Sequence, residues 1–180
     1  MKRFEKAKTG GSVRLTGGAF GGRKISTPGE TTHPMGERER LALFNMLGDL
    51  VGTSLLDAFA GSGALGLEAL SRGAAHVVFI EKNAAAARVI RENLAALGTS
   101  GEVIVGDVAN ADLAEKFDVI LVDPPYDNFE IEKILPLVDL LKDGGTLVLS
   151  HPGEAPAIEG LVLEKTRQYA AAHLSFYRLS

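Results

Sequence analysis

The chain contains no cysteine, which excludes disulfide bonds and metal sites built from thiolates. It has no apolar run near the roughly 20 residues that a membrane-spanning helix needs. The charged residues at positions 1–6 lead into no apolar segment of the kind found in secretory signals, and there is no internal repeat or low-complexity tract. These absences indicate a cytoplasmic protein, and 180 residues suggest a single domain with a sizeable core.

Charge is unevenly distributed along the chain. The net charge is −4, but residues 1–24 carry +6 and the remainder carries −10. The basic side chains of the first segment are Lys2, Arg3, Lys6, Lys8, Arg14, Arg23 and Lys24. A basic arm on an acidic body is typical of an extension that contacts nucleic-acid phosphates. A solvated tail would show the same pattern, and residues 2–8 fit either interpretation.

Short apolar runs alternate with helical patterns through the middle of the chain. The expected strands are 54–59, 76–81, 103–105, 117–122 and 146–149. The expected helices are 64–72 before Gly73, a segment from the cap Asn83 to Gly98, and about 129–141 with a break at Pro136. Further antiparallel strands are expected at 161–165 and 174–179. The alternation predicts an α/β fold with a mostly parallel sheet covered on both faces.

Polar residues gather where the predicted strands end. They are the segment 57–63, Glu81, Asp107 and Asp123, which follow four different strands. In parallel sheets of this kind ligands bind outside the carboxyl ends of the strands, at the switch in strand order. The coincidence predicts a binding site at that edge.

A glycine loop follows the first of these strands. Residues 61–66 match the pattern G-x-G-x-x-G, which usually indicates a dinucleotide. Asp57, however, is poorly placed beside a pyrophosphate and well placed for a cationic amino-acid group. Glu81 can bind both hydroxyls of a ribose, and Asp107 can accept from an adenine amine. Together these groups fit S-adenosylmethionine better than NAD. No His, Asp and Glu residues have metal-ligand spacing, so no metal is predicted.

The segment Asp123-Pro124-Pro125-Tyr126 ends the strand 117–122. Its two prolines remove two N–H donors and stiffen the chain, while the carbonyls remain free to accept. Asp123 and the Pro124 carbonyl can accept from an amine on a planar group, and Tyr126 can stack on the ring. A proline-rich turn that merely closes a strand is the other interpretation of these four residues.

Three stretches of the chain resemble the RsmD family, bacterial methyltransferases that modify the N2 amine of a guanine in small-subunit ribosomal RNA. The glycine-loop block 55–74 and the Pro-Pro motif are shared with other amino-methyltransferases. The N-terminal stretch 14–28 and the residues Pro34, Arg38, Arg40 and 43–45 narrow the match to this family. The family usually has basic residues at Ala19 and Gly21, Arg-Pro-Thr at His33-Pro34-Met35, and Glu at Leu41. These departures lie in the region expected to touch RNA or close over the cofactor.

The resemblance implies a Rossmann-like class I S-adenosylmethionine-dependent methyltransferase fold. It has a mostly parallel seven-stranded sheet, an antiparallel C-terminal strand and an N-terminal β-hairpin. Residues 1–36 would form the basic arm and hairpin, and 37–180 the methyltransferase domain. The implied partner is 16S ribosomal RNA, free or within an assembling small subunit.

The resemblance also implies a set of site residues. The catalytic residues would be Asp123, Pro124, Pro125 and Tyr126. The cofactor-binding residues would be Asp57, Phe59, Gly61, Ser62, Gly63, Glu81, Lys82, Asp107, Val108 and Asp123. The RNA-binding residues would be Arg14, Arg23, Lys24, Arg38 and Arg40. One of Arg38 and Arg40 would meet a phosphate or a site carboxylate, and a solvated helix face is the other interpretation of this pair.

Three other functions are compatible with parts of this pattern. An amino-methyltransferase of DNA or of protein glutamine shares the chemistry, but usually carries a separate recognition domain for which 180 residues leave no room. A nicotinamide-dependent oxidoreductase is opposed by Asp57 and the Pro-Pro motif. A non-catalytic RNA-binding protein that retains the fold is opposed by the intact Asp123 and glycine loop.

Overall fold

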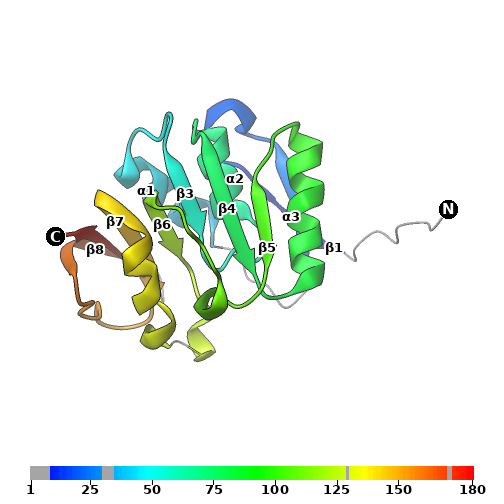
Figure 1. Cartoon of the computed structure of the whole chain (residues 1–180). Helices are drawn as coiled ribbons and strands as arrows, with labels where there is room; N and C mark the ends of the chain where they lie inside the picture. The colour runs from blue at the N-terminus through cyan, green and yellow to red at the C-terminus, as the bar shows by residue number, and fades with distance from the viewer. Residues whose placement is uncertain (1–8, 30–34, 129, 170–171) are drawn as a thin grey trace.

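The computed structural model describes residues 9–29, 35–128, 130–169 and 172–180, and within them a seven-stranded sheet forms the centre of the molecule (Figure 1). Its strands are β3 (Ser54–Asp57), β4 (His76–Glu81), β5 (Glu102–Val105), β6 (Phe117–Val122), β7 (Leu141–His151), β8 (Leu161–Tyr169) and β9 (Ala172–Leu179). They lie in the order β5-β4-β3-β6-β7-β9-β8. The predicted strands and the predicted fold class are confirmed.

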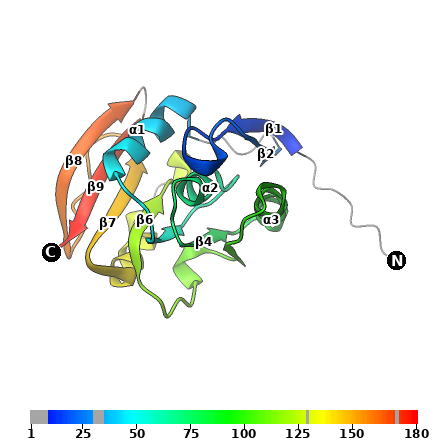
Figure 2. The same ribbon diagram turned by 90° about the horizontal axis from the view of Figure 1, so that it is seen from above.

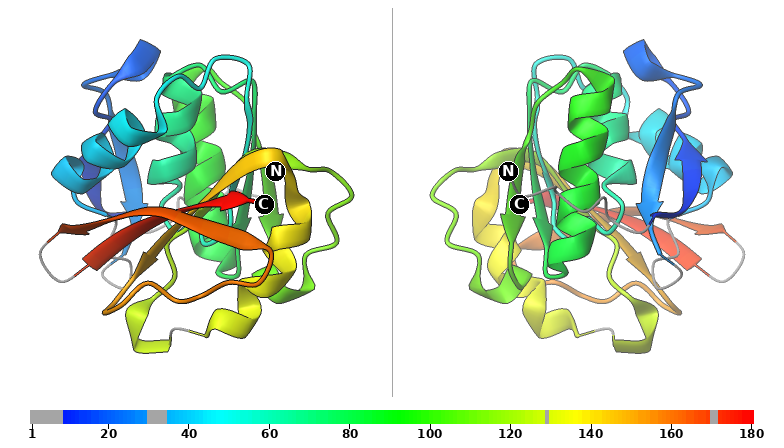
Figure 3. Two further views of the ribbon diagram at one scale, coloured as in Figure 1. Left: turned by 90° about the vertical axis from the view of Figure 1, so that its left-hand side faces the viewer. Right: turned by 90° about the vertical axis from the view of Figure 1, so that its right-hand side faces the viewer.

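Strand direction divides the sheet into two parts. The strands from β5 to β7 run parallel, whereas β9 runs antiparallel to both of its neighbours, β7 and β8 (Figure 3). Strand order reverses around β3, which pairs with β4 on one side and β6 on the other. Ligand sites form at such a reversal because the connections leave it in opposite directions.

In the described part of the chain, three α-helices lie over one face of the sheet, together with the N-terminal hairpin (Figure 2). They are α1 (Glu37–Leu47), α2 (Ala64–Ser71) and α3 (Ala84–Leu97). Asn83 caps α3, because its side chain accepts from the backbone N–H groups of Ala85 and Ala86, and Gly98 ends the helix at a φ of 71°. Both ends of α3 are therefore confirmed as predicted. No helix in the described ranges is both long and apolar enough to cross a membrane.

The opposite face is covered by short 3₁₀ segments, and here the prediction of one helix over about 129–141 is wrong. The segments are Tyr126–Asn128, Ile131–Lys133 and Leu135–Leu140, while residue 129 lies outside the described residues. Pro136 sits in the first turn of the last segment. It has no N–H and disfavours the α conformation at the preceding residue, so α-helical bonding does not run through this position. Bonds of the i to i+3 type, such as Leu137 N–H to the Ile134 carbonyl, take its place.

The core lies on both faces of the sheet, and alternate residues of each strand serve the two faces. Leu55, Val77 and Leu121 pack against the α-helices, whereas their neighbours in sequence pack against the 3₁₀ segments. A strand buried on both sides has no polar face, which explains the continuous apolar runs in the sequence. Fully burying one such side chain contributes about 1.5–3 kcal/mol to stability.

The N-terminal hairpin pairs β1 (Thr9–Arg14) with β2 (Lys24–Pro28) and packs on α3. The backbone of Ser26 exchanges two hydrogen bonds with the side chain of Asn93, each 2.9 Å long. Leu15 and Ile25 are buried in the same apolar cluster as α2 and α3. The predicted hairpin is confirmed and shares the core of the sheet. A boundary between residues 36 and 37 stays a prediction.

A buried carboxylate joins the hairpin to α2. Glu68 has no exposed surface, and its two oxygens accept from the backbone N–H and the hydroxyl of Thr16, each at 2.7 Å. The Nε of Arg72 donates to Oε1 at 2.9 Å. Burying a carboxylate is costly unless its oxygens are hydrogen-bonded and paired with a positive charge, as they are here.

Arg40 brings α1 into the same network. Its Nε lies 3.4 Å from Glu68 Oε2, and its other nitrogens donate to the carbonyls of Met35 and Arg14. Arg40 has no exposed surface. The prediction that Arg40 binds RNA is therefore wrong, because its guanidinium already interacts with an internal carboxylate and two internal carbonyls.

We expect Glu68→Gln to lower the free energy of unfolding by about 3 kcal/mol, because it leaves the Arg40 guanidinium buried without a counter-charge. Urea denaturation measures this loss. Glu92→Gln, on the exposed face of α3, should change stability by less than about 0.5 kcal/mol. Equal losses in the two variants would contradict a dominant role for the buried pair.

Candidate active site

A cleft of about 720 Å³ opens at the carboxyl ends of the central strands. Its walls come from the glycine loop after β3, the end of β4, the Pro-Pro motif after β6, Ser150 near the end of β7, and the start of α1. A smaller cavity of about 60 Å³ shares part of this wall and continues toward the loop after β5. The sheet therefore brings together, at one edge, the strand-end residues that the sequence singled out.

The glycine loop owes its shape to conformations that glycine adopts readily. Gly61 and Gly63 have φ values of 53° and 77°, and Gly63 is the residue at which α2 begins. A Cβ on Gly66 would lie 2.2 Å from the ring of Phe79, so this position must be bare for α2 to pack on β4. The loop thus turns sharply from β3 and points the N-terminus of α2 at the cleft.

Asp57 lies beneath this loop and does not line the cleft. Its side chain is buried, and Oδ2 accepts from the backbone N–H of Gly66 at 2.9 Å. Oδ1 has no hydrogen-bond partner among the described residues. Burial, together with the charges of Asp123 and Glu81, raises the pKa of Asp57 to about 7. The direct contact with an amino-acid group that the sequence predicts is not available to it here, because the loop covers it.

Glu81 ties the loop to the next strand. Its Oε2 accepts from the backbone N–H of Gly61 at 2.7 Å, and its Oε1 accepts from Asn83 at 2.8 Å. The residue borders both cavities. Because a carboxylate has about four acceptor sites, these bonds leave capacity for two hydroxyl groups.

The smaller cavity has both apolar and charged lining residues. Ala58, Ile80 and Val108 form its apolar wall, with Asp107 at its border. Asp107 Oδ1 accepts from the backbone N–H of Ala109 at 3.0 Å, which leaves the second oxygen for a donor on a ligand. An apolar wall beside the Asp107 carboxylate suits a planar ring that carries an amine.

The Pro-Pro motif forms the opposite wall of the cleft. Burial raises the pKa of Asp123 to about 6, a hydrogen bond with the Ser150 side chain opposes that rise, and the charge of Glu39 adds to it. The hydroxyl of Tyr126 is hydrogen-bonded with that of Ser150, while 37% of the Tyr126 surface is exposed. Asp123, Pro124 and Tyr126 thus line the same cleft, with the Tyr126 hydroxyl bonded to Ser150.

Two residues of this site escaped the sequence analysis. Ser150 is only 2% exposed and contacts both Tyr126 and Asp123. It directly follows a predicted strand, 146–149, and the strand-end argument applied to the other strands could have found it. Glu39 lines the cleft from the first turn of α1. No motif marks it, since its place depends on how α1 packs.

Comparisons with known proteins show which family the chain resembles. The profile of a protein family described as conserved hypothetical protein 95 matches residues 13–178. Ribosomal RNA small subunit methyltransferase D of Escherichia coli is 39% identical over 142 residues, which are 76% of this chain and 70% of that protein. The putative rRNA methyltransferase YlbH of Bacillus subtilis is 31% identical over 181 residues, covering 92% and 98%.

The chain belongs to the RsmD family. The solved structure of the putative methyltransferase yhhF of Escherichia coli superposes with a TM-score of 0.85 at 31% identity and covers 94% of this chain and 99% of that one. A putative sam-dependent methyltransferase of Streptococcus mutans has a TM-score of 0.70 at 13% identity, covering 87% and 53%, and shows the shared fold. The resemblance inferred from the sequence is confirmed.

The cofactor of the RsmD family is S-adenosylmethionine, and the residues of the cleft fit it. The smaller cavity beside Val108 and Asp107 suits adenine, and the free acceptor capacity of Glu81 suits ribose hydroxyls. The main cleft beside the glycine loop has room for the methionine part. The charge of Glu81 and the other carboxylates around the loop favours a ligand that carries positive charge.

The predicted RNA-binding residues differ in their exposure and in their contacts. Arg14, Lys24 and Arg38 are exposed, as an RNA contact requires. The guanidinium of Arg23 is also exposed, but it donates to the carbonyls of Ala96 and Leu97 at the end of α3, at 2.7 and 3.4 Å. Lys2, Arg3, Lys6, Lys8, His33 and Pro34 lie outside the described residues.

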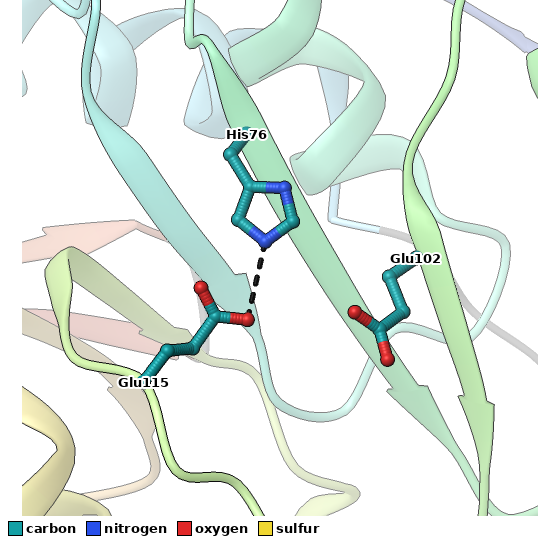
Figure 4. Close-up of side chains that lie close together, drawn as sticks. All are labelled: His76, Glu102 and Glu115. Atoms are coloured by element: carbon teal, nitrogen blue, oxygen red, sulfur yellow. Dashed lines mark hydrogen bonds and ion pairs between the residues drawn. The ribbon is translucent and has the colours of Figure 1, made fainter.

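A group of possible metal ligands lies at the amino ends of the strands, away from the cleft (Figure 4). His76, Glu102 and Glu115 bring their ligand atoms within 4.8 Å of one another. The spacing argument missed them because they come from β4, β5 and the segment before β6. The side chains of His76 and Glu115 are each 42% exposed and already contact each other at 3.2 Å. We therefore assign no ion to them, and the absence of a metal stays a prediction.

The pKa of Asp57 makes stability depend on pH. The folded value is about 7, against an ordinary 3.8, so folding favours the protonated carboxyl and stability falls as the pH rises through that window. We expect Asp57→Asn to gain stability over the unmodified chain by about 1 kcal/mol per pH unit between about pH 5 and pH 7. Urea denaturation of the ligand-free proteins measures this difference. The exposed Asp112→Asn should differ by a constant amount, and the same constancy for Asp57→Asn would contradict the assignment.

Proposed function

We propose that this protein transfers a methyl group from S-adenosylmethionine to the exocyclic N2 amine of a guanine in 16S ribosomal RNA, free or within an assembling small subunit. The observation that carries the proposal is the wall formed by Asp123, Pro124 and Tyr126 facing the glycine loop across one cleft. The names of the relatives in Escherichia coli and Bacillus subtilis support ribosomal RNA as the substrate class. Such a substrate would place the reaction in the cytoplasm.

The residues of this wall would compensate for the poor nucleophilicity of the amine. The lone pair of an exocyclic amine on guanine is delocalised into the ring. Hydrogen-bond acceptors at Asp123 and the Pro124 carbonyl would pull the two amine hydrogens out of the ring plane and localise the lone pair on nitrogen. Pro125 has no N–H of its own, so its backbone offers no competing donor beside that carbonyl.

When bound, the cofactor supplies a methyl carbon on a positively charged sulfur, and attack by N2 forms the N–C bond as the C–S bond breaks. The chain's own contribution is then positioning and proton handling. The amine becomes acidic once methylated, and Asp123, with a pKa of about 6, can take the released proton near neutral pH. No strong base is needed before transfer.

Tyr126 supports the base that enters the cleft. Its ring is fixed from behind by the bond between its hydroxyl and Ser150, and part of the ring remains exposed to the cleft. An exposed ring of this kind can stack on a base that has left its RNA context, as enzymes acting on bases require. Ser150 thereby positions the ring and bonds to Asp123 at the same time.

The hairpin surface formed by Arg14, Lys24 and Arg38 is the proposed RNA contact. Arg14 and Lys24 are cross-strand partners on β1 and β2, and both are exposed. Like charges directly opposite each other destabilise a strand pair, so an anionic partner would relieve their repulsion. The carbonyl of Arg14 accepts from Arg40 of α1, which brings the helix that carries Arg38 beside the hairpin.

The test is transfer of labelled methyl from S-adenosylmethionine to small-subunit RNA, naked and assembled, with nuclease digestion to identify the nucleoside. We expect N2-methylguanosine. Asp123→Ala should lower the rate by about 100-fold or more while the protein still binds the cofactor. Asp143→Ala, which removes an exposed carboxylate near the amino end of β7, should keep full activity. Label only in DNA, in a protein glutamine or in another base would overturn the proposal, as would unchanged turnover by Asp123→Ala.

For the hairpin surface, we expect Lys24→Glu and Arg38→Glu each to weaken RNA binding. Each should also flatten the slope of log affinity against log salt concentration by about one, the loss of one phosphate contact. Filter binding at several salt concentrations measures the slope. Lys116→Glu, exposed at the amino edge of β6, is the matched control and should leave the slope unchanged. An unaltered slope in all three variants would rule out this surface as the contact.

A further inference from the structure

Glu39 is a second carboxylate on the substrate side of the cleft. It lines the same cavity as Asp123 and Tyr126. Its negative charge contributes to the raised pKa of Asp123 and to the raised pKa of Tyr126. Its Oε2 accepts from the backbone N–H of Gly36 at 3.3 Å, and in the described residues its Oε1 has no partner.

The position of Glu39 is fixed by its neighbour in sequence. Arg40 is buried, paired with Glu68, and donates to the Met35 carbonyl at 2.9 Å. The backbone N–H of Arg40 also donates to the Gly36 carbonyl. The first turn of α1 is therefore held on both sides of Glu39, and the free Oε1 belongs to a rigid segment rather than to a loose loop.

Two acceptors that line one cavity suit two neighbouring donors on a base. Guanine presents such a pair, because its N1–H lies beside its N2 amine. Adenine and cytosine place a ring-nitrogen acceptor beside their amine, and that acceptor would face a carboxylate in this cleft. Leaving a buried polar group unpaired or opposed discriminates far more strongly than a difference in shape.

We propose that Glu39 accepts a hydrogen bond from N1–H of the target guanine while Asp123 and the Pro124 carbonyl hold its N2 amine, so that Glu39 selects guanine over the other amine-bearing bases. This inference rests on the proposed function and adds to it the residue that reads the base. The capping contact with Gly36 uses only Oε2, so it leaves Oε1 of this cleft-lining residue without a partner among the described residues.

The experiment compares two small-subunit RNAs that are identical except at the methylated position. One carries guanine and the other 2-aminopurine, which keeps the 2-amine but has an acceptor at N1. We expect the unmodified protein to prefer guanine in kcat/KM by about 100-fold or more. Glu39→Gln should shrink that preference to within about 10-fold, because the amide can donate to N1 of 2-aminopurine and accepts more weakly from guanine.

The controls separate base reading from folding. Glu37→Gln removes an exposed charge from the same helix turn and should leave the preference unchanged. Glutamine retains the capping bond to Gly36, so Glu39→Gln should unfold at the same temperature and bind S-adenosylmethionine as before. Glu39→Ala, which has no acceptor, should also shrink the preference, through a lower rate on guanine.

The outcomes distinguish the two proposals. If the unmodified protein methylates guanine and Glu39→Gln keeps the same preference, Glu39 does not read the base and the proposed function stands. If the unmodified protein transfers no methyl to guanine in either RNA or particle, both proposals fall. A preference that collapses in Glu39→Gln but not in Glu37→Gln supports the assignment.

Discussion

The buried charge of Glu68 is the constraint on which the functional parts of this molecule depend. Its carboxylate bonds to Thr16 in the turn after β1, to Arg72 just after α2 and to Arg40 in α1. The helix that carries Glu68 is also the one that begins at the glycine loop. One internal ion cluster therefore sets the relative positions of the cofactor loop, the start of α1 in the cleft wall and the basic hairpin. Removing one partner from such a cluster costs more than the cluster contributes as a whole.

Acidic side chains are concentrated at the carboxyl ends of the central strands. Asp57, Glu81, Asp123 and Glu39 come from four separate elements. Burial raises the pKa of Asp57 and Asp123 above ordinary values, and the neighbouring carboxylates add to that rise. Such a concentration of acceptors is costly in the ligand-free protein. It suits a site that holds a positively charged cofactor, and it agrees with the proposed binding of a base through its donors.

Where local rules decide, the sequence predicted the structure well. The turn at Gly61 and Gly63, the cap at Asn83 and the strand before Asp123 follow from backbone conformations and apolar runs within a few residues. The wrong prediction of one helix over 129–141 also concerns local structure. Pro136 was expected to interrupt an α-helix, but the chain around it forms 3₁₀ turns instead. Short 3₁₀ turns cover that face of the sheet with the same apolar residues, because burial needs the side chains and not a particular helix type.

By itself the sequence determined the fold class, the family, the glycine loop and the Pro-Pro motif, because each depends on residues adjacent in the chain. Only the tertiary structure decided which charges are internal and which meet the cleft. Arg38 and Arg40 look alike in sequence, yet Arg40 is buried against Glu68 while Arg38 stays exposed. Ser150 and Glu39 join Asp123 only because β7 and α1 pack beside β6. Contacts between residues far apart in sequence depend on the packing of whole elements, which no short pattern encodes.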